Sequence, residues 1–223
     1  MTVARCLVPV PVVAALWSWP ARADVNDGSY GRLDGDFSLS IETGASVAFR
    51  AQEPASGALA VRAGMLYLHT VGVMAQYNDA LGIDAAPLAR SIVGTVELRP
   101  LFLGRFAEDQ QQGPAHLDLL ADSFALGLGI YGSWQSDDYC QPTLVAAPCR
   151  DLGMELSMGA EVSILPQANS PFFGLRGAVR WTFNETDGGY DPDPFPPQFM
   201  LTLSFGYHHV LLVHLVDPSD RAD

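Results

Sequence analysis

The 223-residue sequence contains no lysine, so all 12 of its basic residues are arginines. Only 17% of the chain is charged, and its 25 acidic residues bring the formal net charge to −13. Proteins that bind nucleic acid need a basic surface to neutralise phosphates. The composition therefore argues against a nucleic-acid partner.

Long apolar runs are also missing after the N-terminus. None approaches the 20 or so residues that a membrane-spanning helix needs. The N-terminus itself combines Arg5, an apolar stretch from Leu7 to Trp17, and an Ala21-Arg22-Ala23 sequence. This order is typical of a cleaved secretory signal peptide, although a disordered apolar N-terminus is the alternative. We expect residues 1–23 to be the leader, 24–35 a flexible lead-in, 36–216 one domain and 217–223 a polar tail.

Cysteine is scarce, with three residues in all. Cys6 lies in the expected leader, which leaves Cys140 and Cys149 on either side of a short loop. An even pair in an exported chain predicts a disulfide, with two free thiols as the alternative. A metal site would need further ligands at suitable spacing, and we expect neither a metal nor another cofactor.

Strict alternation of apolar and polar residues is the strongest pattern present. It runs from Gly153 to Ile164 and again from Phe173 to Phe183, with a Pro-Gln-Ala-Asn-Ser-Pro break between them. A period of two predicts β-strands, and the proline-bounded break predicts a turn. Glutamates occupy the polar face of the first strand and arginines that of the second, so pairing would bring opposite charges together.

Five other segments show the same alternation, giving seven strands in total. The five lie at residues 36–49, 59–77, 91–104, 117–134 and 198–213. Pro100 indicates a bulge or a strand end in the third of them. A phase slip near Ala121 to Ser123 predicts a β-bulge, with a short helical turn at His116 to Asp122 as the alternative. We expect no helix of ordinary length after the leader.

The length and lining of these strands favour a membrane barrel over a soluble one. They exceed the mean of five or six residues of soluble strands, and their polar faces carry mostly small residues with isolated charges. Aromatic residues gather near strand ends, as in interfacial girdles. These are Phe37, Phe49, Tyr67, Tyr77, Phe102, Phe106, Tyr131, Trp134, Phe172, Phe173, Trp181, Phe183, Phe205 and Tyr207. We predict an all-β fold, an antiparallel up-and-down transmembrane β-barrel.

Strands such as G-M-E-L-S-M-G-A-E-V-S-I-L and F-F-G-L-R-G-A-V-R-W-T-F resemble those of small bacterial outer-membrane β-barrel proteins of the porin-like superfamily. The resemblance covers about residues 36–215. It implies an outer-membrane location, contact with lipid and an even strand number, for which eight is nearest. The eighth strand is then expected within 117–134 or 24–33. One departure is that the last strand continues through His208 and His209, whereas the family often ends on an aromatic residue.

Eight charged residues fall on the polar faces and would point into the lumen. They are Glu42, Arg62, Glu97, Arg99, Glu155, Glu161, Arg176 and Arg180. An eight-stranded barrel has room only for side chains, and an unpaired buried charge is costly. Four acids and four arginines therefore predict a salt-bridged plug. The alternative is that these charges lie in water at the barrel rims.

The predicted function is a structural or surface-interaction role, with acidic loops as the contact for a surface ligand. The loop acids are Asp84, Asp137, Asp138, Asp187, Asp191 and Asp193. Three alternatives remain: a narrow channel, a soluble periplasmic barrel for an apolar ligand, and a lipid-modifying enzyme. Candidate residues for the enzyme are His208, His209, His214, Ser204 and Glu161. Because G-x-S-x-G and H-E-x-x-H motifs are absent, we expect no enzymatic activity.

Overall fold

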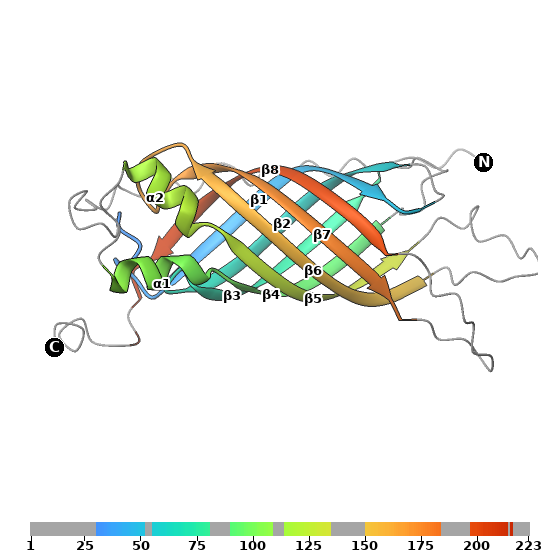
Figure 1. Ribbon diagram of the computed structural model, residues 1–223, viewed down its shortest axis with the longest axis horizontal. Coiled ribbons are helices and arrows are strands. Elements are labelled where there is room, and N and C mark those ends of the chain that lie inside the picture. The colour runs from blue at the N-terminus through green and yellow to red at the C-terminus, as the bar shows by residue number, and fades with distance from the viewer. Residues whose placement is uncertain are drawn as a thin grey trace, which may run out of the picture.

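The computed structural model describes residues 30–51, 55–80, 90–108, 114–134, 150–183, 197–213 and 215. Eight strands form a closed barrel in which each strand pairs with the next along the chain. The last strand pairs antiparallel with the first, and every other pairing is antiparallel as well. The predicted up-and-down barrel, with eight strands, is confirmed (Figure 1).

The strands and two short helices follow one another along the chain. Their bounds are β1 (Phe37–Phe49), β2 (Ser56–Tyr67), β3 (Val71–Asp79), β4 (Arg90–Leu98), α1 (Pro100–Ala107), α2 (Ala115–Asp122), β5 (Ala125–Trp134), β6 (Arg150–Ser163), β7 (Pro171–Thr182) and β8 (Gln198–Leu211). Neither helix is long and apolar enough to span a membrane.

The barrel has two different ends because all strands run up and down in sequence order. We call one the capped end; it carries residues 30–36, the β2–β3 turn, both helices, the β6–β7 turn and residues 212, 213 and 215. Figure 1 shows α1 and α2 at this end. The other, here the loop end, carries the β1–β2, β3–β4, β5–β6 and β7–β8 connections. Most residues of those connections lie outside the described part of the chain.

The eighth strand arises where the sequence predicted one long strand, at 59–77. A tight turn at Leu68 and His69 divides this segment into β2 and β3, and the Thr70 N–H donates to the Tyr67 carbonyl at 2.9 Å. Both turn residues have positive φ, 47° and 54°, as mirror-image hairpin turns require. Glycine or asparagine normally marks such turns. The prediction failed because neither residue is present, and the proposed locations at 117–134 and 24–33 were wrong.

Two expected strands are shorter than predicted because their ends are helical. The third ends at Leu98, and Pro100 begins α1, where its missing N–H and fixed φ suit the first helical turn. The fourth begins only at Ala125, since residues 115–122 form α2. The helical alternative near His116 to Asp122 is therefore right, and the bulge at Ala121 to Ser123 is wrong. The expectation was of no helix of ordinary length after the leader; the structure has two short helices of eight residues each.

Most of the described aromatic residues that the sequence placed in a girdle lie on the exterior, but three of them are inside. Phe37 packs against Tyr67 and Phe173 against Phe205, with ring centroids 5.5 and 5.3 Å apart. Phe102, Tyr131 and Phe172 are instead buried. Phe172 stacks on His208 at 4.3 Å, and Arg32 lies 4.3 Å above the Phe102 ring. These three residues do not belong to an interfacial girdle, because their positions on the strands or on α1 turn them inward.

Candidate functional site

The barrel exterior is apolar across all eight strands. Large hydrophobic side chains on every strand are about half exposed, among them Ile41, Val61, Val73, Val96, Leu128, Leu156, Leu175 and Leu203. Residues between them on the same strands face inward and are buried. A continuous apolar surface around a closed barrel matches the hydrocarbon of a bilayer, where no open sheet edge is tolerated. The chain thus has the build of a transmembrane barrel of the outer-membrane type.

Glu97 lies at the centre of a charge network inside this barrel. Its side chain on β4 is fully buried and contacts three arginines. Arg99 Nε lies 3.1 Å from one carboxylate oxygen, Arg176 Nη2 lies 2.9 Å from the other, and Arg62 Nη2 also donates to Glu97. One carboxylate thus joins arginines contributed by β2, the segment after β4, and β7. Such convergence crosslinks distant strands through the lumen.

The network continues from Glu97 toward both ends. Arg62 also donates to Glu42 at 2.5 Å, and Ser204 Oγ donates to the other Glu42 oxygen at 2.6 Å. Arg99 makes a bidentate contact with Glu161, at 2.6 and 2.9 Å. Planar guanidinium and carboxylate groups are well matched in this geometry. The result is a connected chain of charges, from Glu42 to Glu161, across the interior.

A separate pair occupies the part of the lumen nearer the loop end. Glu155 and Arg180 are register partners on β6 and β7, and Arg180 Nε donates to Glu155 at 2.7 Å. Arg180 also donates to Ser91 at 3.2 Å and lies 5.0 Å from the centroid of the Tyr131 ring. This is the Glu–Arg contact that alternation in the β6–β7 hairpin suggested.

All eight predicted lumen charges face the interior, and the structure brings every one into an ion pair with another member. Seven of them are less than a tenth exposed, and Arg176 is largely buried. Sequence reasoning missed three polar partners of the network: Ser204, His208 and Ser91. Ser204 and His208 occupy inward-facing positions of β8. A serine or histidine in a sequence does not, however, indicate which group it will hydrogen-bond.

A second polar cluster closes the capped end. Arg32 donates to Asp122 on α2 at 2.6 Å, and the Tyr30 hydroxyl donates to Asp118 at 2.8 Å. Burial, followed by this hydrogen bond to Asp118, raises the pKa of Tyr30, so the phenol remains a donor. Arg105 from α1 contacts both aspartates, at 2.8 Å for Asp122. The cluster ties the N-terminal segment 30–36 to both helices over the barrel mouth.

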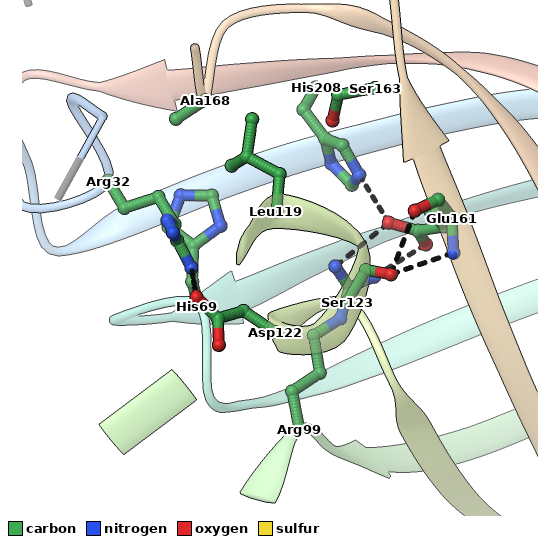
Figure 2. Close-up of a pocket in the computed structure, with 10 residues that line it drawn as sticks. All are labelled: Arg32, His69, Arg99, Leu119, Asp122, Ser123, Glu161, Ser163, Ala168 and His208. Carbon is green, nitrogen blue, oxygen red and sulfur yellow. Dashed lines mark hydrogen bonds and ion pairs between the residues drawn. The ribbon is translucent and has the colours of Figure 1, made fainter. Parts of the chain in front are cut away.

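Two small cavities lie within the described part of this interior. One of about 30 Å³ lies at the capped end between Arg32, His69, Arg99, Leu119, Asp122, Ser123, Glu161, Ser163, Ala168 and His208. Figure 2 shows His208 and Arg99 converging on Glu161, with Arg32 beside His69 and Asp122. A second, of about 10 Å³, lies next to Glu42, Arg62 and Arg176. A buried water needs about 10–15 Å³, so these spaces admit one or two water molecules.

The residues weighed as catalytic do not form an accessible site. His208 Nε2 lies 2.7 Å from Glu161, but both side chains are buried in the lumen. Ser204 also faces inward and donates to Glu42. His209 lies on the other face of β8 and is partly exposed, as expected for adjacent strand residues. His214 lies outside the described residues.

Among the described residues, no group of three or more histidine, cysteine or acidic side chains is arranged to hold a metal ion. Cys140 and Cys149 lie in the undescribed stretch between β5 and β6, so their disulfide stays a prediction. The acidic loop residues at 84, 137, 138, 187, 191 and 193 are likewise outside the described part.

Comparison with known proteins finds similarity only at the level of structure. No protein-family model matches the sequence, and no curated protein matches it. The N-terminal β-barrel domain of Pseudomonas aeruginosa OprF superposes with a TM-score of 0.42 at 10% identity, over 76% of this chain and 97% of that one.

Two further solved structures give similar TM-scores, identities and coverages. The outer membrane protein OprG from P. aeruginosa gives a TM-score of 0.39 at 10% identity, over 79% of this chain and 97% of OprG. The attachment invasion locus protein Ail of Yersinia pestis gives 0.34 at 11% identity, over 78% and 99%. The barrel assignment rests on the strand pairing of this chain itself.

Proposed function

We propose that this protein is a closed outer-membrane β-barrel, a rigid membrane scaffold that presents the connections at its loop end to the surroundings. Its role is structural or surface-interacting rather than enzymatic or channel-forming. The observation that carries the proposal is the buried network around Glu97, in which three arginines meet one carboxylate. Paired charges of both signs occupy the described part of the interior, which favours a closed lumen over an open channel.

The exterior supports the membrane part of the proposal. A soluble barrel turns its apolar face inward and covers its outside with charge, but here the exposed faces of β1 to β8 are apolar and the inward faces polar. Burying this band in hydrocarbon removes the apolar area from water, worth about 25 cal/mol per Å². A soluble barrel for an apolar ligand would need an apolar cavity, and the cavity linings here are charged.

The enclosed position of His208 and Glu161 argues against the lipid-modifying alternative. Lipid contacts the outer surface, whereas these side chains are buried in the lumen, at a cavity that Ser123 and Leu119 also line. The acidic connections at the loop end remain the proposed contact for a surface partner.

The membrane assignment is tested by cell fractionation and by gel mobility before and after boiling in detergent. We expect the protein in the outer-membrane fraction, with a band that shifts on heating because folded membrane barrels resist detergent. Recovery in the soluble periplasmic fraction without a heat shift would overturn the assignment.

A further inference from the structure

Two buried histidines, His69 and His208, face the same cavity at the capped end. They are 6% and 5% exposed, and their ring centroids lie 6.4 Å apart. His208 Nε2 is occupied by Glu161, but His208 Nδ1 and His69 Nε2 have no hydrogen-bond partner. Buried polar atoms without partners are uncommon. The lumen network does not use His69 at all, so its position needs another explanation.

The backbone conformation that positions His69 is energetically unfavourable. It follows Leu68 in a turn where both residues have positive φ, a conformation disfavoured for residues with a Cβ atom. Neighbouring segments fix this turn: Leu68 N–H donates to the Asp36 carbonyl at 2.7 Å, and Arg99 N–H donates to the Thr70 carbonyl at 2.6 Å. Strained residues that surrounding structure maintains are frequent at functional and switching sites.

The charges around His69 are balanced only while the histidine is neutral. The titratable and charged groups that face it from the surrounding segments are Arg32, Arg99, Asp122, Glu161 and His208. Asp36 contacts this turn through its backbone carbonyl, and its carboxylate accepts from the Leu215 N–H. Arg32 is already paired with Asp122, and Arg99 with Glu161. Burial, then the His208 imidazole and the Arg32 and Arg99 guanidiniums, holds the pKa of His69 well below its ordinary 6.5. A proton added to His69 would therefore place a positive charge beside Arg32 and Arg99, whose carboxylate partners are already in ion pairs.

We propose that the capped end is an acid-sensitive latch, in which protonation of His69 detaches residues 30–36 from the barrel mouth. Arg32 is the cation that can leave, because its segment lies outside the sheet and reaches the barrel through Tyr30–Asp118, Arg32–Asp122 and backbone contacts. Arg99 is held in the lumen by both Glu161 and Glu97. Departure of Arg32 removes one positive charge from the cavity and admits water to both imidazoles.

The pH range of the detachment follows from the linkage between proton binding and attachment of the segment. A base whose pKa is lowered on folding contributes stability that is present above its unfolded value and is lost as pH falls below it. For His69 this loss begins near pH 6.5, well above the range in which ordinary aspartates titrate. Because His69 takes up one proton, the ratio of detached to attached segment rises up to about tenfold per pH unit.

The test is a nitroxide label on Leu33→Cys, a partly exposed position of the segment. The full chain, with Cys6, Cys140 and Cys149 each changed to serine, is reconstituted in lipid vesicles. We expect a broadened, immobile spectrum at pH 7.5 and a reversible change to a mobile one by pH 5, with the band on unheated gels still that of a folded barrel.

Substitutions separate His69 from other titrating groups. His69→Gln should abolish the transition between pH 7.5 and 5. His116→Gln, on the exposed side of α2, is the matched control and should leave it unchanged. A spectrum independent of pH, or the same transition in His69→Gln, would overturn the latch. If His69→Gln does not fold, His69→Asn takes its place, since asparagine tolerates the positive φ of this position, and the same transition in that variant overturns the latch.

Discussion

Replacing Glu97 with glutamine is the sharpest perturbation of the lumen. The change keeps the side-chain shape but removes the one negative charge that Arg62, Arg99 and Arg176 share. Glu97 is completely buried, so solvent cannot take over its role. Arg62 and Arg99 retain Glu42 and Glu161 as partners, whereas Arg176 loses the one ion pair found for it among the described residues.

Removing one partner from a buried ion pair costs about 3–5 kcal/mol, because the remaining charge is left uncompensated. We expect Glu97→Gln to lower the free energy of unfolding by that amount. Glu155→Gln is the matched comparison outside the network, since it leaves Arg180, also buried, with Ser91 and the Tyr131 ring but no carboxylate among the described residues. Its cost should fall in the same range of about 3–5 kcal/mol.

Urea unfolding in lipid vesicles, followed by tryptophan fluorescence, measures both values. The double variant Glu97→Gln/Arg176→Gln restores charge balance, and about 1–3 kcal/mol should be recovered relative to additive losses. If Glu97→Gln is no less stable than the parent, or if the double variant is simply additive, the lumen charges do not act as a coupled network and the reasoning is refuted.

Three further predictions test the exterior, the packing and the loop cysteines. Leu128→Arg, on the outward face of β5, should cost about 2–4 kcal/mol in vesicle unfolding, against about 0–1 for Trp134→Arg at the loop end; equal small costs would contradict a lipid-facing band. Gly44→Ala should destabilise by about 1–3 kcal/mol, because its Cβ would lie 2.1 Å from the Leu203 carbonyl oxygen, whereas the Cβ of Gly94→Ala meets nothing within 4 Å; indistinguishable unfolding curves would argue against this packing. Cys140 and Cys149 should react with a maleimide only after reduction, and labelling without reductant would rule out the disulfide.

Alternation alone was enough to predict much of the barrel. In the β6–β7 hairpin, apolar residues stay on one face and polar residues on the other along both strands. Glu155 and Arg180 could therefore both be assigned to the barrel interior from sequence. The same reasoning placed Glu42 on β1 and Arg62 on β2, which are register partners. Period-two patterns are this informative because a shift of one residue moves every side chain to the other face.

Features that depend on contacts between distant segments could not be predicted. The Leu68–His69 turn has no glycine or asparagine, and its conformation is maintained by Asp36 and Arg99 from other parts of the chain. The helices α1 and α2 are short, and α2 is fixed through tertiary bonds such as Arg32 to Asp122. The importance of Tyr30 and Arg32 was equally hidden, because their partners lie 88 and 90 residues away.

The central claim, that paired charges close the lumen, is tested most directly by current measurements on the purified protein in planar lipid bilayers at pH 7.5. We expect insertion without stable ohmic current steps, because the network from Glu42 to Glu161 lies across the interior. Regular, long-lived conductance steps in the unmodified protein would contradict it and identify the barrel as a channel.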